Sequence, residues 1–289
     1  MPTTIYKSAQ AKKKILALYQ QKLDALKLHY KETQIETKAG KTNVIVVGSE
    51  QLPPVVLLHG VNVGAPIALE AIQGLAQHFC IYAIDILGQP NRSEETRLPL
   101  RDNSYGKWLV EVLDALALER VALIGVSYGG FILQRLIACA PERIERAIFI
   151  VPAGFTNGSA LKAIFKVLIP MRRYLKSRKK QDLHTFMDAF CAEKDAYLVA
   201  YQEAVLEGIY MDTRRPPLLT KKEAQKLDAP VYILAAEDDV FFPGNQTIKK
   251  AQRLFKNLQK TILMENAKHV PAGSDYEMIE QYIAGFLRD

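Results

Sequence analysis

Residues 125–130, Gly-Val-Ser-Tyr-Gly-Gly, form the stretch around which the rest of the chain is organised. The four residues before it are apolar and strand-like, and residues 131–138 repeat apolar side chains at helical spacing. The pattern predicts a strand that turns sharply into a helix at Ser127. Such a turn strains the serine backbone and needs neighbours without a Cβ, which Gly125 and Gly129 supply. The Oγ of Ser127 is then expected to stand exposed at the N-terminal end of the helix.

Strands and helices alternate on both sides of this turn. Strand-like runs occupy residues 34–37, 44–47, 54–58, 80–84, 121–124, 146–151, 231–236 and 261–264. We therefore expect an α/β protein with a mostly parallel sheet of roughly eight strands and helices on both faces. The alternation stops at residues 152–219, which predict a helical insert after the sixth strand. The core is expected to comprise residues 34–151 and 220–289.

Residues 1–33 precede this core and predict an amphipathic helix over residues 8–30. Its apolar side chains recur at helical spacing: Ile15, Leu16, Tyr19, Leu23, Leu26 and Tyr30. We expect this face to pack on the core. Because the opposite face is rich in lysine, attachment to a membrane surface is the alternative.

The composition is that of an ordinary globular protein. The chain has 289 residues, 49% of them hydrophobic, and a formal net charge of +7. A mild basic excess is expected to be solvated surface, with an anionic partner or membrane surface as the sharper alternative. The three widely spaced cysteines, Cys80, Cys139 and Cys191, indicate free thiols in a reducing compartment. The first residues lack the apolar core of a signal peptide, and no run is apolar enough for a membrane span, so we expect a cytoplasmic protein.

Reactive or ionisable side chains follow several of the predicted strands. Ligands of open α/β sheets bind beyond the carboxyl ends of the strands. The residues at those ends are His59, Asp85, Ser127, Glu237, Asp238, Asp239 and His269. A serine hydroxyl becomes a useful nucleophile when a histidine removes its proton, and a carboxylate then fixes the tautomer of that histidine. The order Ser, Asp, His indicates nucleophilic catalysis, with Ser127 as nucleophile and His269 as base.

Taken together, these motifs resemble the α/β-hydrolase fold superfamily from about residue 34 to residue 289. The motifs that carry the resemblance are 59–60, 85–93, 125–130, 237–243 and 269–271. The chain is most similar to the carboxylesterase-like branch of serine hydrolases with a small helical cap. Asp239 is the implied acid because the acid of the family usually precedes a proline by four residues, as Asp239 precedes Pro243. Glu237 and Asp238 are the alternatives.

The resemblance also implies an oxyanion hole and a binding pocket. Its backbone donors would be the N–H groups of Tyr128, after the nucleophile, and Val61, in the loop after His59-Gly60. His59 is expected to brace that loop. Asn62, Phe155 and Phe241 are the candidate pocket residues.

The turn at residues 88–93 departs from the G-x-G-x-S pattern that is frequent in the family. It is one residue longer, and Asn91 stands where a glycine is expected. Because asparagine tolerates left-handed geometry, the turn is expected to survive. The strand–helix turn that carries the nucleophile is called the nucleophile elbow. Ser127 at this turn argues against haloalkane dehalogenases and typical epoxide hydrolases, which use an aspartate there.

The insert at residues 152–219 follows the strand after which the fold usually carries its lid. Its apolar part is expected to roof an acyl or aromatic pocket. Its basic part is most simply a solvated face, and the alternative is attraction of an anionic substrate or lipid surface. The sequence contains no nucleic-acid motif, no zinc-ligand spacing and no glycine-rich phosphate loop, so neither cofactor nor metal is expected.

The expected function is cofactor-independent hydrolysis of a carboxylic ester or related acyl bond through an acyl-enzyme. The expected partner is a small acyl substrate, with no nucleic acid and no stable membrane insertion. A thioesterase, a carbon–carbon bond hydrolase and a perhydrolase are the alternatives on the same triad. Two alternatives outside these enzyme classes are a ligand receptor without turnover and a basic membrane binder.

Overall fold

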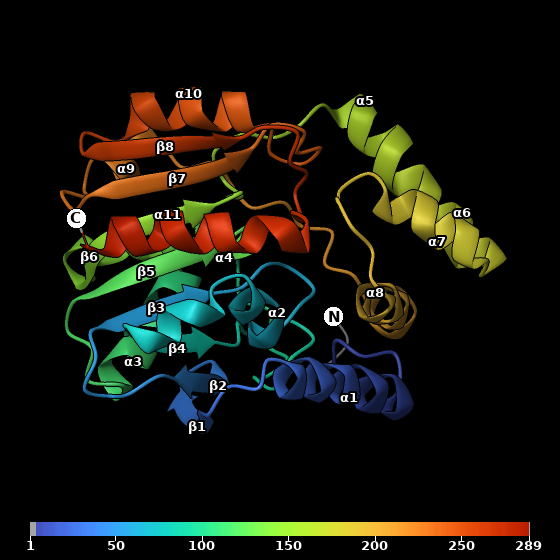
Figure 1. Cartoon of the computed structure of the whole chain (residues 1–289), viewed down its shortest axis with the longest axis horizontal. Helices are drawn as coiled ribbons and strands as arrows, with labels where there is room; N and C mark the ends of the chain where they lie inside the picture. Colours follow the sequence, from blue (N-terminus) through green and yellow to red (C-terminus); the bar gives the residue numbers. More distant parts are fainter. Residues whose placement is uncertain (1–3, 289) are drawn as a thin grey trace.

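The computed structural model describes residues 4–288 and contains one eight-stranded sheet in the order β1-β2-β4-β3-β5-β6-β7-β8 (Figure 1). The strands are β1 Tyr30–Thr37, β2 Gly40–Val47, β3 Pro54–Leu58, β4 Cys80–Ile84, β5 Val121–Val126, β6 Ile144–Ile150, β7 Val231–Ala236 and β8 Leu258–Met264. β1 and β2 form an antiparallel hairpin, β2 joins β4 antiparallel, and every pairing from β4 to β8 is parallel. The predicted fold class is confirmed.

Helices cover both faces of the sheet. The longer ones are α1 Ala9–Ala25, α2 Ala65–Glu70, α3 Ser104–Ala115, α4 Tyr128–Cys139, α6 Ile169–Ser177, α7 Lys180–Met187, α8 Ala196–Gly208, α10 Gly244–Leu254 and α11 Tyr276–Arg288. Short segments are α5 Ala160–Ala163, α9 Lys221–Ala224, the 3-10 turns η1 Gln73–Gln77, η2 Pro141–Arg143 and η4 Gly273–Asp275, and the π-helical turn η3 Ile164–Leu168. One core cluster lies between the sheet and α3, α4, α9 and α10, and a second between the sheet and α1, α2 and α11.

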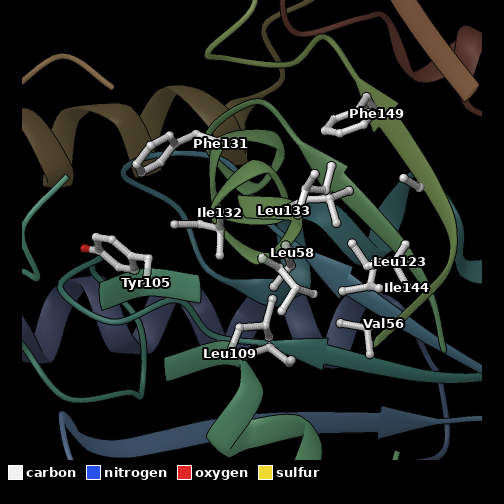
Figure 2. Close-up of a cluster of buried hydrophobic side chains, with 14 of the residues drawn as sticks. Val56, Leu58, Tyr105, Leu109, Leu123, Phe131, Ile132, Leu133, Ile144 and Phe149 are labelled. Atoms are coloured by element: carbon white, nitrogen blue, oxygen red, sulfur yellow. The ribbon is translucent and has the colours of Figure 1, made fainter. Parts of the chain in front are cut away.

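The central strands are buried on both faces, which explains their continuous apolar runs. Side chains of one face of β3 and β5, such as Val56 and Leu123, point into the same cluster as Ile132 and Leu133 of α4 (Figure 2). The alternate side chains, such as Leu57 and Ile124, enter the second cluster. The strand and helix that flank Ser127 are therefore fixed by burial, and the site rests on the rigid centre of the molecule.

The N-terminal helix is shorter than predicted. α1 ends at Ala25, and Tyr30, expected on its apolar face, instead opens β1 and is exposed. Lys27 adopts a left-handed conformation with φ of 53°, which turns the chain out of the helix. The segment between β3 and β4 contains two short helices, α2 and η1, in place of one continuous helix.

The segment 152–219 contains α5 to α8 and no strand of the sheet, and it leaves the sheet beyond the carboxyl end of β6 (Figure 1). α6 and α7 pack together, and their buried side chains contact Val240, Phe241 and Val270 of the core. α8 packs on α1 through Tyr201, Val205 and Ile15. The insert is thus attached both to the N-terminal helix and to the loops that carry the candidate acid and base.

Candidate active site

Ser127 joins β5 to α4 in a strained conformation, with φ of 50° and ψ of −110°. This geometry requires the glycines on either side. A Cβ on Gly129 would lie 2.2 Å from the carbonyl oxygen of Leu58, and one on Gly125 would lie 2.8 Å from the carbonyl oxygen of Gly129. The close approach of strand and helix predicted from the sequence is therefore present.

Three side chains from distant parts of the sequence meet at this turn. The Oγ of Ser127 lies 2.9 Å from Nε2 of His269, and Nδ1 of His269 lies 2.7 Å from Oδ2 of Asp239. Ser127 ends β5, Asp239 follows β7, and His269 follows β8, so parallel strands deliver all three to one edge of the sheet. Because the carboxylate of Asp239 accepts a hydrogen bond from Nδ1–H of His269, Nε2 of the same ring is free to accept the serine proton.

The local structure separates Asp239 from its two neighbours. The side chain of Asp239 is buried, and its Oδ1 accepts hydrogen bonds from the backbone N–H groups of Phe241 at 2.8 Å and Phe242 at 3.0 Å. Glu237 and Asp238 are exposed, and Glu237 accepts instead from the backbone N–H of Asn266 at 3.1 Å. Of the three carboxylates, Asp239 is the one in contact with His269.

Two aromatic rings after Asp239 flank the imidazole. Phe241 and Phe242 meet the ring of His269 edge-on, at centroid distances of 5.1 Å and 5.5 Å. Phe241 also contacts Phe190 of the insert at 5.7 Å. Phe241 was predicted as a pocket residue and lies beside the base. Phe242 was not singled out, although its position next to Phe241 after the acid was a usable signal.

The loop after His59 lies against the serine. A Cβ built on Gly60 would be 3.6 Å from the Cβ and 3.9 Å from the Oγ of Ser127, so the next N–H, that of Val61, belongs to the loop that adjoins the nucleophile. Asn62, with φ of 58°, donates its N–H to Oε1 of buried Gln89 at 2.8 Å. On the other side, Tyr128 begins α4, where backbone N–H groups have no partner within the helix.

His59 is fully buried and acts as a brace for the loops around it. Its Nε2 accepts the backbone N–H of Ile86 at 2.9 Å, so the proton resides on Nδ1, which donates to the carbonyl of Gly60 at 2.7 Å. Burial lowers the pKa of His59 below its usual range, which favours this neutral form.

Asn91 completes the same network by a route that the sequence did not predict. It is absent from the residues with positive φ, so the left-handed turn expected there does not form. Instead its buried amide donates to the carbonyl of Ile86 at 2.9 Å, lies 3.1 Å from Nε2 of His59, and accepts the N–H of Ser93 at 2.9 Å. The hydrogen bonds of the Asn91 side chain, rather than a left-handed backbone conformation, hold the turn.

A second buried group, Asp85, ties the loop after β3 and the start of α2 to the N-terminal helix. Its Oδ1 accepts the N–H of Ala65 at the start of α2 at 2.8 Å. Its Oδ2 accepts from the hydroxyl of Tyr19 at 2.8 Å and the amide of Asn43 at 3.1 Å. Several donors therefore compensate the burial of this carboxylate.

A cavity of about 660 Å³ lies between the insert and the loop of the candidate acid. Its lining includes Asp239, Val240, Phe165 and Lys166, but neither Ser127 nor His269. Phe155, predicted as a pocket residue, lies elsewhere: it is fully buried in the core between Phe149 and Phe255, at centroid distances of 5.1 Å and 5.9 Å.

Within residues 4–288 no group of three or more His, Cys, Asp or Glu side chains is arranged to hold a metal ion. The three cysteines are free thiols; Cys80 and Cys191 are buried, and burial raises the pKa of Cys191 to about 12. A search of the described helices finds none that is both long and apolar enough to cross a bilayer.

The sheet order and the strand–Ser–helix turn are the features of one fold family. A family model described as alpha/beta hydrolase family matches residues 55–281. The chain belongs to the alpha/beta hydrolase family.

Its relatives define the branch. Carboxylesterase YbfK of Bacillus subtilis strain 168 is 25% identical over 287 residues, covering 93% of this chain and 92% of the relative. The uncharacterized carboxylesterase nap of the same strain is 24% identical, covering 87% and 85%. The crystal structure of naproxen esterase from Bacillus subtilis superposes with a TM-score of 0.84 at 21% identity, covering 97% of this chain and 99% of that one. The predicted class, a hydrolase of the carboxylesterase branch, is thereby confirmed.

Proposed function

We propose that the chain is a cofactor-independent serine carboxylesterase that works through an acyl-enzyme. The observation that carries the proposal is the continuous hydrogen-bonded line from Ser127 through His269 to Asp239, at 2.9 Å and 2.7 Å, on a strained elbow. The similarity to proteins named carboxylesterases supports an ester as the substrate class.

In this mechanism Ser127 attacks the ester carbonyl while Nε2 of His269 takes the hydroxyl proton. His269 then protonates the departing alcohol, and the acyl group remains on Oγ of Ser127. Water, activated by the same imidazole, releases the acid and restores the serine. Asp239, held by two backbone N–H groups, keeps Nδ1 protonated and stabilises the imidazolium that forms in each step.

The negative charge on the carbonyl oxygen would be bound by the N–H groups of Val61 and Tyr128. The support is the adjacency of Gly60 to Ser127 and the place of Tyr128 as the first residue of α4, where an N–H has no partner within the helix. One such donor contributes about 3 kcal/mol to the stability of the transition state. The anchoring of Asn62 by Gln89 holds the Val61 loop in place before the substrate arrives.

The first test is active-site labelling with a fluorophosphonate, followed by peptide mapping. We expect one label per chain, on Ser127, and multiple turnovers of an activated ester. Ser127→Ala should lose both, with turnover falling about 10⁶-fold while the circular dichroism spectrum is unchanged. A stalled single turnover would instead favour a ligand receptor, and undiminished hydrolysis by Ser127→Ala would contradict the assignment.

A panel of esters, acyl thioesters and diketones then tests the bond that is cleaved. The proposal requires that esters give the highest kcat/KM. A thioester or a carbon–carbon bond cleaved faster than every ester would keep the triad but replace the substrate class.

A further inference from the structure

One continuous helical stretch of the insert, α5–η3–α6, exposes large apolar side chains. Leu161 and Phe165 are 67% and 65% exposed, and Ile164 and Ile169 are 41% and 46% exposed. We call these four residues the apolar patch. Tyr174, on the inner side of the same stretch, is fully buried. An exposed apolar patch next to charged residues is a mark of an interaction surface.

The charge of the molecule is concentrated on the same stretch. Residues 160–180 contain eight lysines and arginines and no aspartate or glutamate. The rest of the chain holds 30 basic and 31 acidic residues, so its net charge is −1 and the whole formal excess of +7 resides in this segment. All eight basic side chains are exposed: Lys162, Lys166, Arg172, Arg173, Lys176, Arg178, Lys179 and Lys180.

Most of these charges form no ion pair with the residues that the structure describes. Arg173 pairs with Asp182 at 2.7 Å and Arg178 with Glu207 at 2.9 Å. For the other six, no carboxylate of residues 4–288 lies within ion-pair distance. Two of these six, Lys162 and Lys166, line the cavity that Glu237 and Asp238 also line, and the other four are free to bind an external anion.

We propose that α5–η3–α6 docks the protein onto an anionic lipid surface. The apolar patch would enter the boundary between headgroups and acyl chains, and the basic residues would contact anionic headgroups. α5 and α6 lie at the outer edge of the molecule, away from the sheet, where a flat surface can reach them (Figure 1). The inference goes beyond the proposed function and does not depend on it.

Two other binding partners for this surface are a second copy of the chain and a nucleic acid, and the observed residues disfavour both. A two-fold contact with a second copy would place eight positive charges against eight more. A nucleic acid would match the charge, but three of the four patch residues are aliphatic and offer no ring on which bases stack.

The test is co-sedimentation of the full chain with vesicles of phosphatidylcholine alone or mixed with phosphatidylglycerol, at low and high salt. We expect binding to the mixed vesicles only, and its loss at high salt. Lys176→Glu/Lys180→Glu should lower the ratio of bound to free protein at least about tenfold. Leu161→Ser/Ile169→Ser should lower it by a similar factor.

The matched control is Lys107→Glu/Lys256→Glu, which makes the same charge change at exposed positions outside the insert and should retain binding. The circular dichroism spectrum shows whether each variant is folded, and Ser127→Ala should bind vesicles like the parent. Three outcomes would overturn the proposal: no binding to mixed vesicles, equal binding to neutral vesicles, or an equal loss in the control. Self-association without lipid, abolished by Leu161→Ser/Ile169→Ser, would assign the patch to a second copy instead.

Discussion

Single residues without chemical reactivity hold the reactive ones in place. The two backbone N–H groups on Asp239, the edge-on rings of Phe241 and Phe242, and the glycine beside the elbow all fix geometry. Sub-ångström placement matters because general-base transfer needs a donor–acceptor distance near 3 Å.

The choice of acid predicts a large difference between adjacent carboxylates. Asp239→Asn keeps the shape but can present an N–H toward Nδ1 of His269, which favours the wrong tautomer, so kcat should fall about 10⁴-fold. Asp238→Asn changes the exposed neighbouring side chain, which forms no hydrogen bond with His269, and should leave kcat within about twofold. Steady-state kinetics on one activated ester measures both. A large loss in Asp238→Asn, with Asp239→Asn active, would move the acid to the neighbouring carboxylate.

Gly129 predicts a local overpacking effect. In Gly129→Ala the new Cβ would lie 2.2 Å from the carbonyl oxygen of Leu58, so β3 and α4 must separate. The free energy of unfolding should fall by about 1–3 kcal/mol, and turnover should fall with it. Gly285→Ala in α11 is the control, because its Cβ meets nothing within 4 Å, and it should gain up to about 1 kcal/mol. Urea unfolding measures the free energy of unfolding of both variants. Equal values would show that β3 and α4 do not approach closely at Gly129.

The residues that could be predicted were those with a local pattern. Ser127 stands between a strand pattern and a helix pattern, and His269 follows the last strand, so both could be placed at one sheet edge. The bonding of Asn91 to His59 and Ile86 could not be predicted, because it depends on two loops that meet only in three dimensions. The core location of Phe155 was missed for the same reason: its partner Phe255 lies 100 residues further along the chain.

At the scale of elements, the insert holds the loop of the candidate base from both sides. The N–H of Val270 donates to the carbonyl of Phe190 at 2.8 Å, and the N–H of Ala192 donates to the carbonyl of Val270 at 2.9 Å. Nζ of Lys268 donates to the carbonyls of Asp188 and Cys191, at 2.7 Å and 3.3 Å. His269 lies between these two anchors, so a helical insert that lacks the triad residues still sets the position of one.

This attachment predicts an effect of Lys268 on turnover. Lys268→Met removes both side-chain hydrogen bonds to the insert while keeping the apolar stem, and kcat should fall about tenfold because the imidazole is less well placed. Lys194→Met is the matched control: it removes an ion pair with Asp188 but no contact with residues 268–270. Steady-state kinetics detects a change in the placement of the imidazole, and thermal unfolding detects a change in stability. A change in melting temperature without a change in kcat would show that Lys268 only stabilises the insert.

Element types were easier to predict than element ends. The apolar runs of β3, β4 and β7 predicted their bounds, because strands buried on both faces have apolar residues throughout. The end of α1 was missed because Leu26 and Tyr30 continue a helical spacing, while the left-handed Lys27 that stops the helix carries no glycine signal.

At the scale of the whole molecule, one buried network joins β2 and the loops after β3 and β4 to the N-terminal helix. Asp85 connects α1, β2 and the start of α2, and His59 connects the carboxyl end of β3 to the loop after β4. The network lies beneath the loop with Val61, so global stability and the readiness of the proposed oxyanion hole depend on the same groups. Because His59 is titratable, this dependence has a pH signature.

Burial lowers the pKa of His59 in the folded state, whereas the unfolded chain binds a proton near pH 6.5. Below about pH 6.5 the unfolded state therefore binds more protons than the folded state. The stabilising contribution is complete above that pH and falls as the pH drops, by up to about 1.4 kcal/mol per pH unit. His59→Gln should flatten this slope of the free energy of unfolding between pH 7 and pH 5, whatever its stability at pH 7. His78→Gln, at an exposed histidine, should keep the slope of the parent. Urea unfolding across this range measures it, and an unchanged slope in His59→Gln would show that His59 is not the group whose protonation destabilises the fold.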